Sequence, residues 1–270
     1  MGCKKYLFFA DNLVIMRFID THAHIYADEF NADLVEALGE ANKNGIEKIY
    51  MPGIDSSCIE AMFAIEQAYP SQCIAMMGLH PCYVKENYNV ELEIVSTWLA
   101  KRKFAAIGEI GLDYYWDRTF VKEQQEAFQT QMQWALDYDL PIVIHTRNAM
   151  GETIEAVKPF AKKGLRGVFH CFSGSKESAE QIIGMGFYLG LGGVLTYKNA
   201  GVAEAIASIP MEYLVLETDA PYLAPVPYRG KRNEPAFMIE VAKKLAEIKN
   251  LPLHEVGEIT SVNAEKLFAI

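Results

Sequence analysis

The sequence contains eight short apolar runs, and amphipathic stretches separate most of them along the chain. The runs lie at residues 17–20, 46–51, 73–78, 104–108, 141–144, 167–169, 187–191 and 213–216. Their apolar residues are consecutive rather than alternating, which is typical of parallel strands that are buried on both faces. Eight such strands, alternating with helices over roughly 250 residues, form the pattern of a (β/α)8 TIM barrel. The sequence therefore predicts an α/β fold in which the ends of all eight strands meet on one face.

Helices are predicted between and after these strands. The candidate helical ranges are 33–44, 56–68, 121–138, 149–162, 203–208, 236–249 and 253–268. Asn31, Ser56 and Ser175 have side chains that suit the start of a helix, so we expect them to be N-caps. A doubly wound open sheet is the main alternative. No Gly-x-Gly-x-x-Gly follows the first strand, however, so a dinucleotide fold has little support and we expect no organic cofactor.

The chain divides into a short leader and one domain. Residues 1–15 are mildly apolar, but Asp11 and Asn12 interrupt the run and no small-residue cleavage site follows. We therefore expect residues 1–15 to be a dispensable extension or the result of a misassigned start, and residues 16–270 to be a single domain. No apolar run of 18 residues is present, so no membrane partner is expected. Five cysteines without a Cys-x-x-Cys pair favour a reducing, cytoplasmic location.

Residues of metal-ligand type directly follow several of the predicted strands. They are His22 and His24 after the first strand, Glu109 after the fourth, His145 after the fifth, His170 after the sixth and Asp219 after the eighth. Each of them alone is more often an ordinary core, cap or turn residue. Because a barrel brings these strand ends together, the set as a whole predicts one metal site. Mixed imidazole and carboxylate ligands suit zinc, manganese, cobalt or nickel, whereas magnesium, which remains a candidate, prefers oxygen ligands.

Further polar and aromatic residues near the same strand ends are candidate substrate contacts. They are His80, Arg147, Tyr114, Arg229, Lys231 and Arg232. The basic groups suit phosphate oxygens, although a basic loop is more often a solvated surface. Tyr114, Tyr115 and Trp116 suit base stacking, although packing against the rim of the barrel is at least as common. Cys171, beside His170, is more often a buried thiol than a ligand or a nucleophile.

The charge of the chain limits the nucleic acids with which it can work. The net charge is −10, which argues against a protein that coats long duplexes by counterion release. An enzyme that acts on a strand end is compatible with this charge, because bound divalent cations would make its pocket locally positive.

Seven motifs together resemble the TatD family of metal-dependent hydrolases, and the resemblance runs from about residue 18 to residue 268. The motifs lie at residues 19–24, 78–81, 108–115, 145–147, 170–174, 217–223 and 229–235. The most distinctive are His170-Cys171-Phe172-Ser173-Gly174 and the Glu-Thr-Asp that ends at Asp219. Gly190 departs from the pattern, because a serine is expected there, and residues 1–15 lie outside it.

The resemblance implies a (β/α)8 barrel and a DNase that acts as a phosphodiesterase on DNA ends or single strands. It also implies two divalent cations. One would be held by His22, His24 and Asp219. The other would be held by His145 and His170, with Glu109 bridging the two. Asp219 would help to deprotonate a metal-activated water.

Two other functions remain open at this point. An amidohydrolase or esterase with the same metals would cleave a small molecule or an aminoacyl ester. Related barrels often carry a carboxylated lysine where this chain has Glu109, which favours the nuclease. A metal-stabilised binding scaffold would have a coordinatively closed site, whereas six ligands with His80 to spare favour an open one. The sequence makes no prediction of the oligomeric state.

Overall fold

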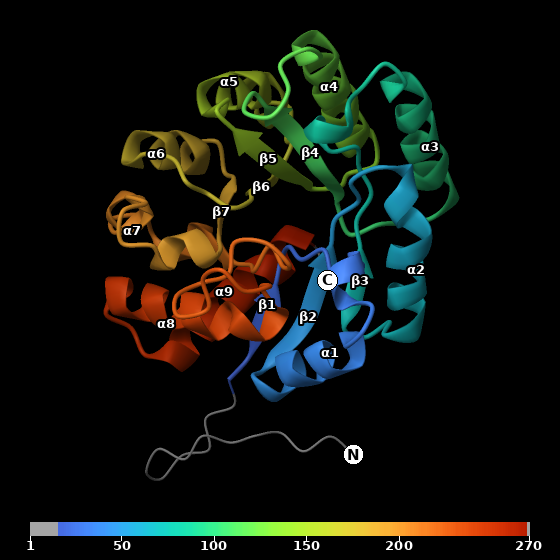
Figure 1. The fold of residues 1–270 in the computed structure, drawn as a ribbon. Helices are drawn as coiled ribbons and strands as arrows, with labels where there is room; N and C mark the ends of the chain where they lie inside the picture. Colours follow the sequence, from blue (N-terminus) through green and yellow to red (C-terminus); the bar gives the residue numbers. More distant parts are fainter. Residues whose placement is uncertain (1–15, 269–270) are drawn as a thin grey trace.

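Eight parallel strands form a ring that is enclosed by helices (Figure 1). The computed structural model describes residues 16–268, and the predicted extension of residues 1–15 lies outside the described residues. The strands are β1 (Phe18–Asp20), β2 (Ile46–Met51), β3 (Cys73–Ala75), β4 (Ile107–Asp113), β5 (Ile142–Arg147), β6 (Gly167–Phe169), β7 (Tyr188–Leu191) and β8 (Leu214–Leu216). The predicted (β/α)8 barrel is confirmed.

The helices alternate with the strands and form the outer layer. They are α1 (Leu34–Lys43), α2 (Ile59–Ala68), α3 (Tyr88–Lys101), α4 (Val121–Asp137), α5 (Met150–Ala161), α6 (Lys176–Gly184), α7 (Val202–Ile206), α8 (Met238–Lys249) and α9 (Leu253–Phe268). Short 3-10 helices lie in the connections, namely η1 (Asp28–Phe30), η2 (Ser56–Cys58), η3 (Pro81–Tyr83), η4 (Gly193–Thr196), η5 (Met211–Tyr213) and η6 (Pro235–Phe237). No helix within residues 16–268 is long and apolar enough to cross a membrane.

Two seams close the ring of strands. β1, β2 and β3 pair in that order, as do β4 to β8, and a single bridge between Met77 and Ile107 joins the two groups. At the other seam, the backbone N–H of Thr21 donates to Leu216 O over 3.1 Å. Asp20 of β1 reinforces this seam, because its carboxylate accepts both the N–H and the hydroxyl of Thr218, at 3.0 and 2.6 Å.

The interior of the barrel is filled with apolar side chains. One buried cluster draws a residue from each of seven strands or strand extensions and continues into α9: Ile19, Tyr50, Met76, Ala106, Val143, Val168, Val215, Ala264, Leu267 and Phe268. The ring of Phe268 stacks on Tyr50 with centroids 4.1 Å apart. The inside of the barrel is therefore a packed core rather than a pore. The polar metal-ligand residues lie at the C-terminal ends of the strands.

Three strands end at other residues than predicted, and five strands start one to three residues later than predicted. β3 ends at Ala75, whereas β4 and β5 continue to Asp113 and Arg147. Glu109 therefore lies within β4 rather than after it. The register of β4 against β5 shifts between Ile107 and Ile110, as at a β-bulge. Such a bulge re-aims a side chain, and here it falls at Glu109.

The helix starts agree with the predicted caps at only one of three positions. Ser175 caps α6, with its side chain accepting a backbone N–H. The predictions for Ser56 and Asn31 are wrong. Asp55 caps η2 instead, because its side chain accepts the Ser57 N–H, while the Ser56 hydroxyl donates to Glu91 on α3. Asn31 ends η1, and α1 starts only after Asp33.

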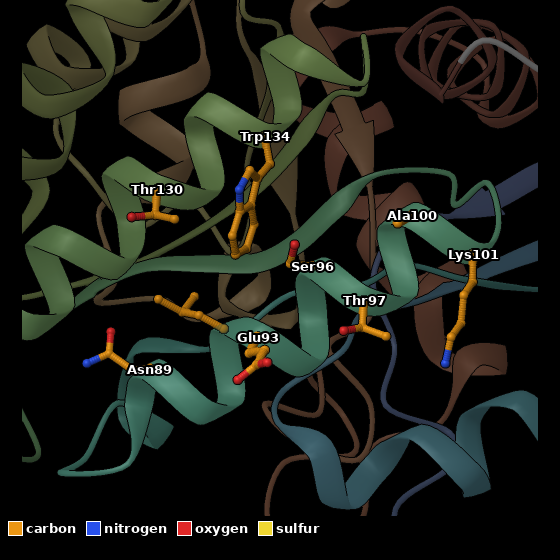
Figure 2. Close-up of a pocket in the computed structure, with 9 residues that line it drawn as sticks. Asn89, Glu93, Ser96, Thr97, Ala100, Lys101, Thr130 and Trp134 are labelled. Carbon is orange, nitrogen blue, oxygen red and sulfur yellow. The ribbon is translucent and has the colours of Figure 1, made fainter.

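The helical exterior carries two features away from the strand ends. A shallow groove of about 700 Å³ runs between α3 and α4 (Figure 2), and among the residues that line it are Glu93, Lys101 and Trp134. It holds no cluster of metal-ligand side chains. Nearby, Arg102 pairs with both carboxylate oxygens of Glu66, one of them at 3.0 Å, and so joins the end of α3 to α2.

Candidate metal centre

The six predicted ligands gather at the C-terminal mouth of the barrel. His22, His24 and Asp219 form one group whose ligand atoms all lie within 4.8 Å of one another, and His22, Glu109 and His170 form a second. A third group brings His80 and His145 to Glu109. The side chains come from β1, β4, β5, β6 and β8 or the residues that directly follow them. The convergence predicted from the strand pattern is therefore what the structure shows.

Glu109 stands between two pairs of histidines. Its Oε2 faces the Nε2 atoms of His22 and His24 at 3.2 and 3.5 Å. Its Oε1 faces His145 Nδ1 and His170 Nε2 at 2.8 and 2.7 Å. The side chain is 3% exposed, so water does not compete for these contacts. A carboxylate whose two oxygens face different ligand sets has the arrangement needed to bridge two cations.

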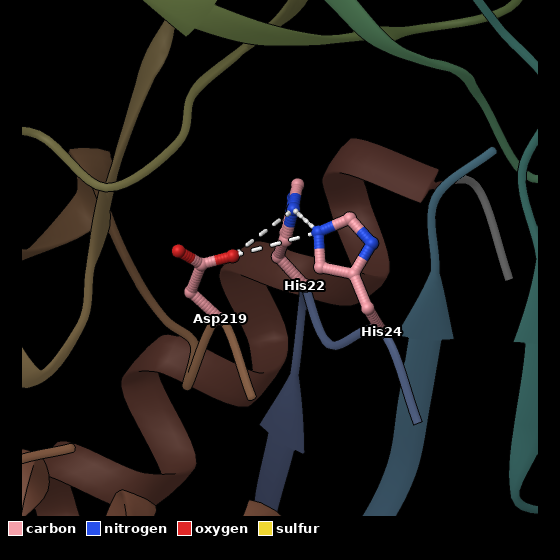
Figure 3. Close-up of side chains that lie close together, drawn as sticks. All are labelled: His22, His24 and Asp219. Atoms are coloured by element: carbon pink, nitrogen blue, oxygen red, sulfur yellow. Dashed lines mark hydrogen bonds and ion pairs between the residues drawn. The ribbon is translucent and has the colours of Figure 1, made fainter. Parts of the chain in front are cut away.

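Asp219 completes the first group from the opposite side of the seam. Figure 3 shows one of its carboxylate oxygens directed at both imidazole rings and the other directed away from them. The near oxygen lies 3.6 Å from His22 Nε2 and 3.5 Å from His24 Nε2. Asp219 has a positive φ of 57°, a conformation that Asp adopts more readily than most residues. The free oxygen is therefore available to a second partner in the mouth.

Three of the histidines face a side-chain oxygen on the side away from the centre, and for His145 and His24 the contact is a hydrogen bond. Asp113 Oδ2 lies 2.9 Å from His145 Nε2. Glu217 Oε1 lies 3.5 Å from His170 Nδ1. Tyr26 Oη lies 2.8 Å from His24 Nδ1 and donates its own proton to Pro52 O at 2.6 Å, so Tyr26 must accept from the ring. With its proton on the outward nitrogen, each ring presents the lone pair of its inward nitrogen to the centre, as a metal ligand must.

No role was predicted from the sequence for these orienting residues. Tyr26, Asp113 and Glu217 are all buried. Glu217 was detectable in principle, because an acid that directly follows the apolar strand β8 needs a partner inside the protein. Asp113 and Tyr26 carry no such local signal.

His80 has the opposite proton arrangement. The backbone N–H of Cys82 donates to its Nδ1 over 3.0 Å. The neutral ring must therefore carry its proton on Nε2, which faces Glu109 Oε1 at 3.3 Å. Burial lowers the pKa of His80, so the neutral form is favoured. His80 is thus a hydrogen-bond donor into the centre, as suits the predicted substrate contact, and in this geometry it is not a metal ligand.

The arrangement of acceptors fits a bound cation. The inward nitrogens of His24, His145 and His170 and the oxygens of Glu109 and Asp219 are all acceptors, and they face one another at about hydrogen-bond distance. Only positive charge between them, from protons or metal ions, makes such contacts favourable. Burial would lower the pKa of His24, but hydrogen bonds to Asp219 and Glu109 outweigh burial and raise it to about 9. The same carboxylates would attract divalent cations, so the residues fit the predicted metals.

Close backbone packing surrounds the centre. A Cβ on Gly111 would lie 1.9 Å from His145 O, and one on Gly190 would lie 2.2 Å from Glu217 Oε2 and 3.1 Å from His170 Cα. Gly190, the departure from the family pattern, is therefore in direct contact with the residue that orients His170. Burial, with the charge of Asp219 second, holds the pKa of the Cys171 thiol well above its usual range, so the thiol is not a reactive thiolate.

The predicted substrate contacts divide into two groups. Arg147, Arg229 and Lys231 are exposed at the mouth. Tyr114 is buried, and its hydroxyl accepts a hydrogen bond from Gln125, so the exposed aromatic residues of its loop are the two that follow it.

Arg232 lies on the predicted basic loop but is already engaged. Its guanidinium makes two 2.7 Å hydrogen bonds to Asp33 and one of 3.0 Å to Glu234. It fastens the loop after β8 to the start of α1, and its predicted role as a phosphate contact does not fit this geometry.

Comparisons with known proteins agree with the geometry. The sequence model of the family described as TatD related DNase matches residues 19–269. The chain is 38% identical over 252 residues to the uncharacterized metal-dependent hydrolase YabD of Bacillus subtilis, covering 93% of this chain and 98% of YabD. The uncharacterized metal-dependent hydrolase YcfH of Escherichia coli is 36% identical over 72% of each chain. The crystal structure of YjjV, a TatD homologue from Escherichia coli, superposes with a TM-score of 0.89 at 32% identity, covering 95% of this chain and 99% of that one.

Proposed function

This chain belongs to the TatD-related DNase family and is a metal-dependent hydrolase, and we propose that it is a deoxyribonuclease that cleaves phosphodiester bonds at DNA ends or in single strands. The proposal includes two divalent cations, of zinc, manganese or magnesium. It also includes a single catalytic domain over residues 16–270 and a cytoplasmic location. The location is supported by the free cysteines of the described part of the chain.

The position of Glu109 is the observation that carries this proposal. Its two oxygens face separate histidine pairs, so one ion would be held by His22, His24 and Asp219 and the other by His145 and His170. A pair of ions bridged in this way activates water and offsets the charge of a phosphodiester during displacement at phosphorus. The family's name supports the same reaction.

Other groups at the mouth have separate tasks in this reaction. The oxygen of Asp219 that points away from the histidines would accept a proton from the attacking water. His80 directs an N–H into the centre, where it can donate to a phosphate oxygen or to the leaving group. Arg147, exposed two residues beyond His145, supplies a positive charge near the scissile group.

The test is a digest of single-stranded oligodeoxynucleotides labelled at the 3′ or the 5′ end, with metal-free protein reconstituted with Mn²⁺, Zn²⁺ or Mg²⁺. We expect stepwise shortening from one end with at least one of these ions. Glu109→Gln, which keeps the shape of the side chain but removes its charge, should abolish the shortening. Glu93→Gln, on the outer face of α3, is the matched control and should leave it unchanged.

The same preparation also tests the alternative function. Panels of amides, lactones and aminoacyl esters would be assayed in parallel with the oligonucleotides. Hydrolysis of an ester or amide panel, with every oligonucleotide left intact under all three ions, would assign the centre to an amidohydrolase or esterase and end the nuclease proposal.

A further inference from the structure

Exposed aromatic side chains gather at the mouth of the barrel. Among residues 16–268, the exposed aromatic residues are Tyr83, Tyr115, Trp116, Tyr138 and Tyr222, and all except Tyr138 follow the C-terminal end of a strand. Tyr83 and Tyr222 also lie within about 6 Å, between ring centroids, of His80 and His24. Aromatic surface left in water beside a catalytic centre is a common mark of a binding site.

Tyr115, Trp116 and Arg147 form a stacked unit on one side of this mouth, which we call the stacking platform. The Arg147 guanidinium carbon lies 3.8 Å from the centroid of the Tyr115 ring and 5.0 Å from that of Trp116. The two rings meet edge to face with centroids 4.9 Å apart. Tyr115 is 51% and Trp116 68% exposed, so much of the planar surface of the platform faces solvent.

The platform is fixed to the metal centre through a single carboxylate. Asp113 Oδ1 accepts the backbone N–H groups of Tyr115 and Trp116 at 2.9 and 3.1 Å, while its Oδ2 holds His145. Arg147 lies on β5 two residues beyond His145, so the two side chains share a face about 7 Å apart along the strand. The rings therefore occupy a defined place beside the candidate centre.

The side chains of this mouth supply few exposed positive charges to a bound strand. The chain carries a net charge of −10, and Arg232 is paired with Asp33. Arg147 has no carboxylate partner within the described residues, but it is the cation of the platform itself. Arg229 and Lys231 are the other exposed cations among the predicted substrate contacts, so we expect contact with the bases to add to binding, and stacking does not depend on the base sequence.

We propose that the stacking platform binds an unpaired nucleobase close to the phosphodiester that is cleaved. This inference rests on the proposed nuclease function and specifies its substrate as a strand whose terminal bases are unstacked. A base laid on Trp116 gains the ring contact and the nearby positive charge of Arg147. In an intact duplex the bases are already stacked on their neighbours, so the platform selects single-stranded or frayed ends.

The test measures KM and kcat for Mn²⁺-loaded protein on an end-labelled oligodeoxythymidine and on copies with one abasic residue at each position near the cleaved end. Trp116→Ala should raise KM for the intact strand by at least about five-fold, the lower end of the effect of removing one stacked base, with kcat retained. In the wild type, one abasic position should raise KM by a similar factor. In Trp116→Ala that position should have no further effect.

Two further variants separate stacking from a structural effect. Trp116→Phe keeps an aromatic face and should restore most of the affinity. Tyr138→Ala removes an aromatic side chain of similar exposure at the opposite end of the barrel, and its KM should equal that of the wild type. Calorimetric titration of Trp116→Ala with Mn²⁺ should match the wild type, which would show that the centre itself is intact.

The possible outcomes distinguish this inference from the function on which it rests. If the wild type cleaves the oligonucleotide and Trp116→Ala has an unchanged KM, the platform is refuted and the nuclease stands. The platform is also refuted if the abasic penalty persists in the variant. If Mn²⁺ binds normally but neither protein cleaves any strand, the proposed function fails and the platform with it.

Discussion

The replacement Asp113→Asn should lower the affinity for one of the two metal ions, because it moves the ring proton of His145 from one nitrogen to the other. Asp113 Oδ1 accepts two backbone N–H groups, and its Oδ2 accepts the Nε2 proton of His145. An asparagine must keep its carbonyl oxygen toward the two backbone donors, so its NH2 group is left facing His145. The ring must then accept at Nε2 and carry its proton on Nδ1, the atom that faces Glu109.

The expected loss of stability can be worked out from the loss of affinity for the ion that His145 would bind. Loss of a residue that orients a metal ligand typically lowers the metal affinity by 10- to 100-fold, or about 1.4–2.7 kcal/mol of binding free energy. At a metal concentration about 100 times the wild-type Kd, the bound ion stabilises the fold by about 2.7 kcal/mol. The variant would keep about 0.4–1.4 kcal/mol of this. At about 2–4 °C per kcal/mol, the contribution of this one ion to the rise in Tm on adding metal should shrink from about 5–10 °C to about 1–5 °C.

Calorimetric titration and thermal unfolding with Mn²⁺ measure both quantities. We expect one of two binding events to weaken and the other, at His22, His24 and Asp219, to persist. Asp117→Asn is the matched control, because Asp117 accepts the Thr119 N–H in the same loop but contacts no histidine. Nitrogen-15 NMR at a pH above the raised pKa of His145 should show its proton moved from Nε2 to Nδ1. An unmoved proton, or two unchanged binding events, would refute the reasoning.

Three further predictions concern the centre and the outer layer. Asp219→Ala should lower kcat at least about 100-fold, as expected for loss of a general base, and should leave a folded protein by circular dichroism; rates near those of the wild type would remove Asp219 from the chemistry. Gly190→Ala should destabilise the fold by about 1–3 kcal/mol and weaken metal binding, because the new Cβ would overlap Glu217. Gly39→Ala on α1, where a Cβ meets open space, is the control and should be neutral or stabilising in the same thermal unfolding assay. Burial would raise the pKa of Glu66, but the hydrogen bond from Arg102 outweighs burial and lowers it from 4.5. Because that pKa is depressed in the folded state, Glu66→Gln should cost about 1–2 kcal/mol at neutral pH, and the difference in urea unfolding should vanish as the pH falls below 4.5; a difference that persists in acid would contradict the ion pair.

The convergence of the ligands was predictable because it follows from topology alone. Parallel strands place their ends on one face, so His22, Glu109 and His170 had to meet once eight strands were identified. Neither the end of β4 nor the bulge was predicted, because a bulge depends on the partner strand. The histidine pairs that face the two oxygens of Glu109 match the sets that the family resemblance implied.

Contacts with distant partners were not predictable from local sequence. Arg232 looked like a free cation in a basic loop, yet its partner Asp33 lies 199 positions away. Tyr114 looked like its neighbours Tyr115 and Trp116, and only the path of the chain after β4 decides which ring is buried. The orienting role of Asp113 is likewise visible only once β4 and β5 lie side by side.

The seam between β1 and β8 has a consequence for how the molecule is completed during synthesis. Asp20 and Thr218 meet there across 198 positions, and His22, His24 and Asp219 lie just beyond them. An ion bound at this point would act as a reversible cross-link between β1 and β8, closing about three quarters of the polypeptide into one loop. A nascent chain cannot acquire that ion until its final strand has left the ribosome. His145 and His170, only 25 positions apart, face no such delay.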